Sequence, residues 1–462
     1  MQSQQEWAVL NFGDCQLGDQ RRTKRLIEVA EQFANNPSAS LAVQNENWSD
    51  LKAAYDLLDC PQVTFEAIAR PHWQLTRKRA TGRCLVIGDT TELDFGKRRQ
   101  IADIGETGNG SGQGFLLHNA LLVQADSEEL LGVAGQTIHY RRKGRQKTRK
   151  LRTDQRMKRD DRESQVWGNV IDDVGPPAEG VEYVHVFDRG ADNFEVFCHL
   201  QQNHGQWVVR AAKLNRKVLV GPTDERVPLK DYLPQMKCLG SYTLSLRSRP
   251  DQKAREATLE IRVGQIKIPR PQHVSPWVRS LKRSAIETNV IEVVEVNPPQ
   301  GVEPIRWILF TSLPIDSFDA VWQAIEYYEM RWLVEEYHKA LKTGCRTEKR
   351  QLKTAGRLEA LVGLTSVVAV RLLQLKSLSR VNPDVPAKRV IPAIWLKMLK
   401  LARKNLTKVH DLTVGQFYRE VARLGGFIGR KSDGNPGWIT IWRGWEKLNT
   451  YVFVASKLKL IE

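Results

Sequence analysis

Hydrophobic positions follow a helical spacing over the first part of the chain. Asp19 can cap a helix, and the apolar residues behind it recur every three or four positions: Leu26, Val29, Ala30 and Phe33. Ser49 and Thr64 can cap two further helices. We therefore predict a helical region over residues 1–78.

From residue 83 the pattern changes to short apolar runs bounded by turn residues, which is typical of strands. Three such runs come first: RCLVIGD, LLHNALLVQAD and ELLGVAGQTIHY. Strands then alternate with helical segments, as in VEYVHVFD followed by DNFEVFCHLQQN and QWVVRAA. This alternation predicts a mixed α/β layer.

A mainly β pattern between about 214 and 304 interrupts this layer and indicates an inserted β region. WILFTSLPI reads as one more strand, and a long helix is expected from about Phe318 to Lys342. We predict an α/β domain over 79–375, which contains the insertion, and a helical domain over 376–462.

The charge of the chain points to nucleic acid as its partner. The formal net charge is +17, and a field of that sign attracts polyanions. A membrane surface is the main rival, but no strongly amphipathic Lys-rich helix stands out. The longest uncharged apolar stretch, 360–370, is also shorter than the roughly 20 residues that span a bilayer. Without a secretion signal at its start, the chain is expected to be cytoplasmic and associated with the nucleoid when bound to DNA.

Two familiar kinds of ligand site are not expected. The six cysteines are scattered with no C-x-x-C pair and no suitable His spacing, so they read as reduced thiols and not as zinc ligands. The glycine cluster GETGNGSGQG matches neither of the common phosphate-binding motifs, so no nucleotide cofactor is expected.

Basic residues concentrate in two places. One cluster opens the first capped helix, where cations oppose the helix dipole, and consists of Arg21, Arg22, Lys24 and Arg25. A phosphate partner would explain it, and a merely solvated basic face is the alternative. The other is the run 141–159, which has little to bury and is expected to be an exposed arm or loop that contacts nucleic acid.

Three acids stand out as metal ligands. Asp89 follows the apolar CLVIG and Asp188 follows the apolar YVHVF, so both are expected at the ends of buried strands. On the predicted long helix, Arg331, Glu335 and Lys342 follow Tyr328 at spacings that place all four on a stripe about 60° wide. A solvated face with ion pairs between successive turns would also fit that stripe. Two strand-end aspartates and a helical glutamate form an oxygen ligand set suited to Mg²⁺.

These residues resemble the insertion-sequence-four class of bacterial DDE transposases, most closely its transposon-five type. Tyr328, Arg331, Glu335 and Lys342 match the family's Tyr-(2)-Arg-(3)-Glu-(6)-Lys signature, inside YEMRWLVEEYHKALKTG. GDTTELDF and FDRGAD are similar to the two aspartate motifs, and further similarity extends over essentially the whole chain. One position departs from the pattern, because Gly190 stands where close relatives have Glu.

The resemblance implies a ribonuclease-H-like catalytic core with an inserted β-sheet subdomain between helical N-terminal and C-terminal domains. It also implies a homodimer that pairs two DNA ends, binds terminal inverted repeats through the N-terminal helices and joins them to target DNA. Two Mg²⁺ ions, with Mn²⁺ as a substitute, would be held by Asp89, Asp188 and Glu335. DNA contacts would come from Tyr328, Arg331, Lys342, Arg210 and Trp307, the last receiving a flipped base.

Two other functions remain open. A catalytically silent regulator or inhibitor of transposition would bind the same DNA without cutting it. A ribonuclease-H-like nuclease would cut without joining, but it would need neither the N-terminal helices nor the C-terminal ones.

Overall fold

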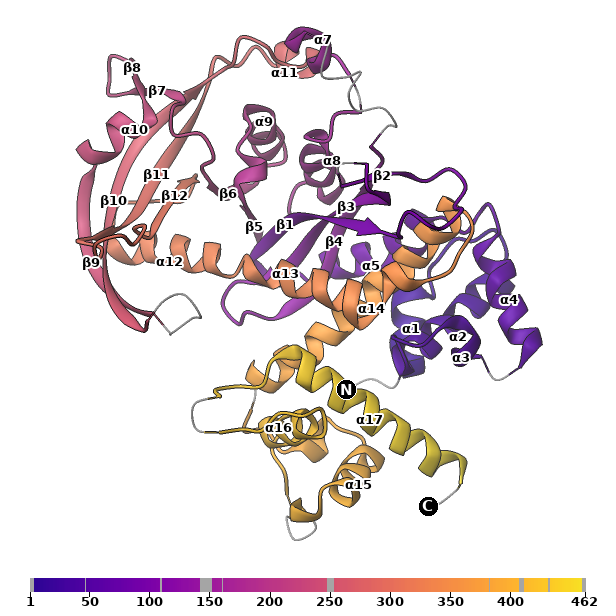
Figure 1. The fold of residues 1–462 in the computed structure, drawn as a ribbon. Coiled ribbons are helices and arrows are strands. Elements are labelled where there is room, and N and C mark those ends of the chain that lie inside the picture. Colours follow the sequence, from indigo (N-terminus) through magenta and orange to yellow (C-terminus); the bar gives the residue numbers. More distant parts are fainter. Residues whose placement is uncertain are drawn as a thin grey trace.

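The computed structural model describes residues 4–45, 47–108, 110–141, 152–159, 161–246, 253–381, 383–406, 411–430 and 433–458 (Figure 1). A sheet of twelve strands forms the centre of the molecule, with helical regions at both ends of the chain. The predicted mixed α/β class is confirmed. Most of the basic run, residues 142–151, lies outside the described residues.

Five helices form the N-terminal region, as the spacing predicted: α1 (Gln4–Phe12), α2 (Gln20–Asn35), α3 (Leu41–Gln44), α4 (Trp48–Leu58) and α5 (Phe65–Lys78). Asp19 caps α2 and Thr64 caps α5 through their side-chain oxygens. The expectation for Ser49 was wrong, because α4 begins earlier and Asn47 caps it.

The first half of the sheet holds β1 (Gly82–Asp94), β2 (Gly105–Thr107), β3 (Gly112–Gln124), β4 (Leu130–His139), β5 (Val181–Phe187) and β6 (Gln206–Arg210). Strand β3 pairs antiparallel with β1 and β4, whereas β5 lies parallel to β1 and β6 parallel to β5. Helices α7 (Thr153–Met157), α8 (Gln165–Val174) and α9 (Phe194–Gln202) and the short η1 (Arg189–Ala191) belong to the same stretch.

The inserted β region contains β7 (Lys217–Val220), β8 (Glu225–Pro228), β9 (Lys237–Leu246), β10 (Arg255–Pro269) and β11 (Ala285–Val296), with α10 (Leu229–Tyr232), η2 (Leu233–Gln235) and α11 (Pro276–Ser280). Strand β12 (Arg306–Thr311) pairs with β11 on one side and with β6 on the other. The insertion therefore extends the central sheet through continuous hydrogen bonding, which its sequence pattern did not predict.

The helix expected from Phe318 to Lys342 is broken. It consists of α12 (Phe318–Glu329), α13 (Trp332–Lys339) and the π-helical η3 (Ala340–Gly344). At the first break, the amide of Arg331 bonds to the carbonyl of Tyr328, three residues back, and not to the carbonyl four back. This tighter turn separates the two helices, and a periodicity argument that assumes one continuous helix cannot detect it.

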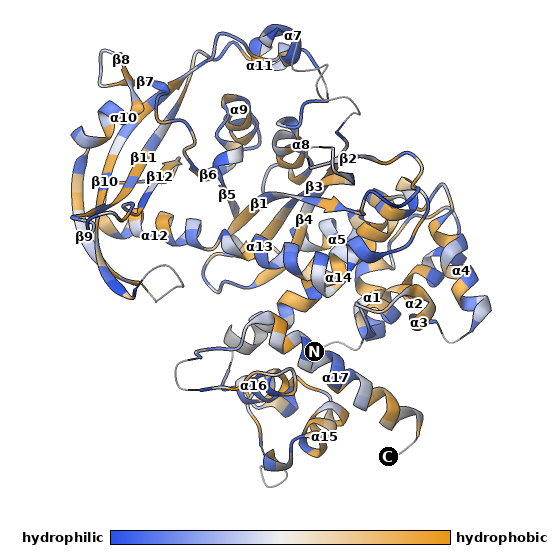
Figure 2. Cartoon of the chain, viewed as in Figure 1, coloured by the Kyte–Doolittle hydropathy of each residue, from blue (hydrophilic) through white to orange (hydrophobic). Residues whose placement is uncertain are grey.

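The elements of the described residues that follow are helical: η4 (Thr347–Lys349), α14 (Ala355–Val381), η5 (Ala387–Arg389), α15 (Ala393–Ala402), η6 (Lys404–Leu406), α16 (Val414–Leu424) and α17 (Trp438–Lys457). The main hydrophobic core joins the N-terminal helices, one face of the sheet, α14 and the C-terminal helices. A second core lies between α9 and the inserted strands. Figure 2 shows β3 and β4 coloured mainly as apolar, which fits their burial.

Candidate active site

Asp89 and Asp188 lie on neighbouring strands. The parallel pairing of β1 with β5 ends at Gly88 and Phe187, so the two aspartates are the next residues on their strands. Asp188 follows β5 and caps η1, as expected of a strand-end acid. Asp89 does not end its strand, because β1 continues to Asp94 through its pairing with β3.

Helix α13 brings Glu335 to this pair. Nη1 of Arg331 lies 3.1 Å from Oδ2 of Asp89 and 3.8 Å from Oε1 of Glu335. The side chain of Asp89 is only 15% exposed. Arg331 therefore connects the first acid of the sheet with the acid of the helix.

Negative charge accumulates at Asp89. Burial raises its pKa to about 6, and the neighbouring Asp188 and Glu335 carboxylates act in the same direction, against the Thr90 amide and the Arg331 guanidinium. A carboxylate whose ionised form is disfavoured in this way is stabilised by a cation. Oxygen donors of this kind suit a hard divalent ion.

The three acids nevertheless do not form a closed cage. Within the described part of the chain, no three His, Cys, Asp or Glu side chains are close enough to share one ion. The donor set fits a metal by its chemistry and its charge, and Arg331 provides the positive charge that Asp89 contacts in this structure.

A cavity of about 290 Å³ adjoins these residues. Its lining combines the acids Asp89, Glu92 and Glu335 with the cations Lys339 and Lys342, three threonines and His338. The ammonium of Lys342 lies 3.6 Å from Glu348. Such a cavity can receive a phosphate group together with its counter-ions.

Tyr328 does not share a helical face with Glu335, because the helix breaks between them. Its side chain is 6% exposed and packs edge-on against Trp307, with ring centroids 5.9 Å apart. Trp307 itself is partly buried against the main core. The predicted single stripe was therefore wrong for Tyr328, although Arg331, Glu335 and Lys342 do meet at the site.

The remaining predicted DNA-contacting residues lie elsewhere. Arg210 is half-buried at the end of β6, where its backbone pairs with Leu309. On α2, Arg21 and Lys24 are exposed, whereas Arg22 bonds to Leu17 and Gln62, and Arg25 pairs with Glu28 and Asp50. Two of the four cations on α2 thus serve contacts within the chain.

Gly190 lies too close to its neighbours for a side chain to be added without a shift. Its amide donates to Oδ1 of Asp188 at 2.7 Å. A Cβ at this position would lie 3.0 Å from the same oxygen and 3.0 Å from the ring of Trp167. A glutamate here would require Trp167 or Asp188 to move.

Three polar residues near the site escaped the sequence argument: Asn119, Gln136 and His338. Asn119 and Gln136 are buried in β3 and β4, and Asn119 donates to His338 at 3.0 Å. Burial and the charges of Lys342 and Arg331 lower the pKa of His338 to about 3. The available signal was an amide side chain within a mainly apolar run of each strand, LLHNALLV in β3 and LLGVAGQ in β4.

Among the described helices, none combines the length and the apolar character needed to cross a membrane. Three family models match the chain. Residues 4–63 match a transposase DNA-binding family, residues 141–370 a transposase DDE domain, and residues 367–459 the Tn5 transposase dimerisation domain.

The DDE match includes Asp188 and Glu335 but begins after Asp89, which reaches the site through the pairing of β1 with β5. The DDE domain implies a ribonuclease-H-like core, in agreement with three antiparallel strands followed by two parallel ones. The flanking matches indicate DNA binding and homodimer formation. The chain is a DNA transposase and belongs to the DDE transposases of the insertion-sequence-four family, related to that of Tn5.

Proposed function

We propose that this transposase catalyses cut-and-paste transposition, in which it binds the terminal inverted repeats of its element, cleaves both ends and joins them to target DNA. The observation that supports this most directly is that Arg331 contacts both Asp89 and Glu335, while the charge of Asp188 also acts on Asp89. We assign end recognition to residues 1–78, catalysis to 79–375 and dimerisation to 376–462.

Asp89, Asp188 and Glu335 are the proposed ligands of two Mg²⁺ ions, for which Mn²⁺ can substitute. The bound ions would activate the attacking oxygen and stabilise the leaving oxygen of an in-line displacement at phosphorus. Support comes from the raised pKa of Asp89, which reflects burial and two neighbouring carboxylates.

Basic side chains hold the DNA strand at this site. Arg331 keeps the Asp89 carboxylate in position through their contact and can share its remaining donors with a phosphate. Lys342 lines the same cavity and provides a second positive charge. Tyr328 packs against Trp307, and its proposed phosphate contact requires its hydroxyl to reach the DNA strand.

The reaction sequence follows from one site acting repeatedly. Hydrolysis of one strand frees a 3′ hydroxyl, which attacks the opposite strand to form a hairpin. Water reopens the hairpin, and the recovered 3′ hydroxyl then attacks target DNA. Each step exchanges one oxygen for another at a phosphorus, so the same carboxylates can serve all of them.

Trp307 is the proposed acceptor of a base extruded near the hairpin. Stacking of a base on an aromatic ring stabilises it by about 1–3 kcal/mol, enough to hold it outside the helix. Trp307 is only partly buried, so the residue is not closed off within the core. On α2, the exposed Arg21 and Lys24 are better placed than Arg22 and Arg25 for contacts with terminal-repeat phosphates, and Arg210 is a further candidate.

The test uses purified full-length protein and a plasmid that carries its coding region with the native flanking DNA. We expect double-strand breaks at inverted repeats that require Mg²⁺ and that yield hairpin ends on denaturing gels. Glu335→Gln should abolish cleavage but retain binding. Glu336→Gln, which changes the neighbouring carboxylate outside the cavity lining, is the matched control and should cleave.

A wild-type protein that binds these ends but never cuts them, with Mn²⁺ as well as Mg²⁺, would identify a silent regulator instead. Cleavage without strand joining would identify a nuclease. Mapping the breaks also provides the end sequence for synthetic substrates.

A further inference from the structure

A row of polar side chains crosses the sheet beside Asp89. Asp89 pairs with Asn119 on β3, and Asn119 pairs with Gln136 on β4. Residues directly opposite each other on antiparallel strands project from the same face. Asn119 and Gln136 are buried, so the row must be satisfied by hydrogen bonds within the protein.

The hydrogen bonds of this row run in one direction. The indole nitrogen of Trp73 donates to Oε1 of Gln136 at 3.3 Å, and Nε2 of Gln136 donates to Oδ1 of Asn119 at 2.6 Å. Nδ2 of Asn119 then lies 3.0 Å from Nε2 of His338. Because an indole can only donate, it sets the orientation of both amides. Nε2 of His338 is therefore an acceptor, and the ring proton belongs on Nδ1.

His338, which holds this proton on Nδ1, lies at the active site. It follows Glu335 by three residues on α13, which places both on one helical face. Both side chains line the 290 Å³ cavity with Asp89. The one side-chain hydrogen bond of His338 to the described residues is that from Asn119, so among these residues its Nδ1–H has no partner.

We propose that His338 donates its Nδ1–H to an oxygen of the DNA phosphate bound in this cavity, and that Trp73, Gln136 and Asn119 hold the tautomer that makes this possible. The inference rests on the proposed function, since it assigns a contact to that same site. A nitrogen that carries a proton cannot be a metal ligand, so His338 is a donor and not a fourth ligand. A neutral donor also adds no positive charge that would repel the metal ions.

Two substitutions of His338 distinguish the role of Nδ1 from that of Nε2. The amide nitrogen of asparagine can occupy the position of Nδ1, and that of glutamine the position of Nε2. We expect His338→Asn to retain most of the cleavage rate, and His338→Gln to lose about tenfold to a hundredfold, the range for a hydrogen bond to a charged group. Binding to a duplex end, measured in Ca²⁺, should be unchanged in both.

A buried histidine elsewhere provides the control. His72 on α5 is also buried and bonds to Asn11 and Thr76. His72→Gln should lower the melting temperature without changing the cleavage rate below it. Equal losses in His338→Asn and His338→Gln, or a greater loss in His338→Asn, would overturn the donor assignment.

A modified substrate provides a measurement, the effect of a phosphorothioate on the cleavage rate, that would not change if His338 had a purely structural role. Sulfur accepts hydrogen bonds less well than oxygen, so one phosphorothioate diastereomer at the scissile phosphate should slow the wild-type protein. In His338→Ala, the part of this effect that depends on the histidine should disappear. A thio effect of the same size in both proteins would show that His338 does not contact the phosphate.

The two proposals fail differently. If Glu335→Gln cleaves like the wild type, the proposed active site is wrong and the inference falls with it. Glu335→Gln could instead be inactive while His338→Asn and His338→Gln cleave at the wild-type rate and His338→Ala shows the wild-type thio effect. In that case only the role of His338 is wrong.

Discussion

Asp89 carries an energetic cost in the absence of a cation. Burial and the charges of Asp188 and Glu335 raise its pKa from 3.8 to about 6, so its ionised form is less stable in the folded protein than in the unfolded chain. A rise of this size corresponds to about 3 kcal/mol as an upper limit. The stability associated with protonated Asp89 is fully present below pH 3.8 and is lost as the pH rises through about 6.

Asp89→Asn should therefore stabilise the metal-free protein. In EDTA at pH 8, we expect a higher melting temperature than that of the wild type, with a difference that shrinks as the pH falls through about 6. Added Mg²⁺ should stabilise the wild type and not the variant. Asp59→Asn is the control, because Arg357 lowers the pKa of Asp59 and its substitution should bring no gain. A less stable Asp89→Asn at pH 8 would mean that Arg331 compensates the charge fully.

At this scale the sequence predicted the acids better than their surroundings. Asp89 and Asp188 each follow an apolar run, which made them candidates, and the helical glutamate and the family resemblance were needed to select them as ligands. The links from Asn119 to His338 and from Arg331 to Asp89 join residues more than two hundred positions apart. Such contacts depend on strand register and on a helix break, which no local pattern encodes.

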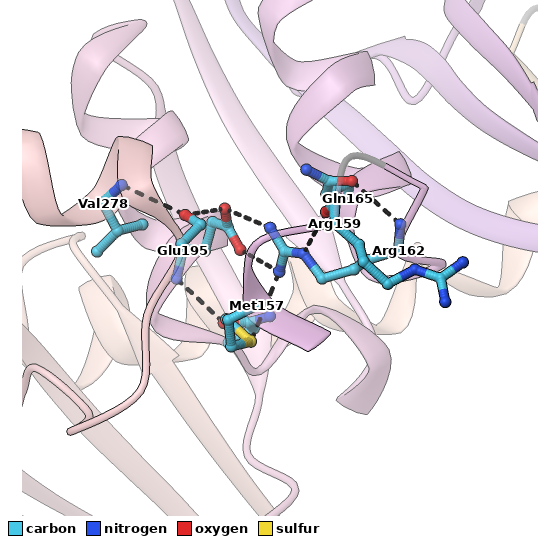
Figure 3. Close-up of polar contacts among 8 residues, drawn as sticks. Met157, Arg159, Arg162, Gln165, Glu195 and Val278 are labelled. Carbon is cyan, nitrogen blue, oxygen red and sulfur yellow. Dashed lines mark hydrogen bonds and ion pairs between the residues drawn. The ribbon is translucent and has the colours of Figure 1, made fainter. Parts of the chain in front are cut away.

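A buried ion pair ties the segment after the basic run to α9. Figure 3 shows Arg162 directed toward Glu195, and the two side chains form a bidentate pair at 2.8 and 2.9 Å. Ser275, just before α11, donates to the same carboxylate at 2.6 Å. Both charged side chains are only 9% exposed, so each depends on the other for its charge to be balanced. Three segments that are distant in the sequence thus meet at Glu195.

Arg162→Met should destabilise the protein by about 3–5 kcal/mol, because it leaves the Glu195 carboxylate buried without its partner. Urea unfolding at pH 7 measures this, and Arg162→Met combined with Glu195→Gln should recover part of the loss. Although burial opposes it, bonding to Arg162 and Ser275 lowers the pKa of Glu195 below 4.5. The contribution of the ion pair to stability is therefore present above pH 4.5 and is lost as the pH falls below it.

The exposed ion pair of Lys388 and Asp411 is the control, and its removal should lower the free energy of unfolding by less than about 1 kcal/mol.

The helices and strands themselves were largely predictable from the sequence, whereas the break between α12 and α13 and the pairing of the insertion with β6 were not. Caps and apolar spacing located α2 and α5 because both signals are local. The break at Arg331 and the union of the insertion with β6 through β12 arise from tertiary contacts. The first feature lies at Arg331, which contacts Asp89, and the second places the insertion on the edge of β6 opposite β5.

At the scale of the molecule, charge and hydrophobicity serve different contacts. The net charge of +17 suits an enzyme that must hold DNA at several places at once. Exposed apolar residues gather instead near the end of the chain, where Tyr451 and Val454 on α17 and Leu458 directly after it are 43%, 46% and 61% exposed. Their spacing of three and four residues places them on one helical face. This face lies within the region that matches the dimerisation domain.

We expect the homodimer to depend on this face of α17. Val454→Glu with Leu458→Glu should place charge in an apolar contact and weaken self-association by at least tenfold, because two buried aliphatic side chains contribute several kcal/mol. Sedimentation velocity of the full-length protein with duplex ends would show single-end complexes in place of paired ones, with binding to one end unchanged. Leu401→Glu is the matched control, since Leu401 is equally exposed but lies on α15. If Leu401→Glu disrupts pairing and the α17 variant does not, the interface lies on α15. Under the proposed mechanism, in which two paired ends are cleaved and joined, loss of pairing should also reduce strand transfer while Glu335 and its neighbours remain intact.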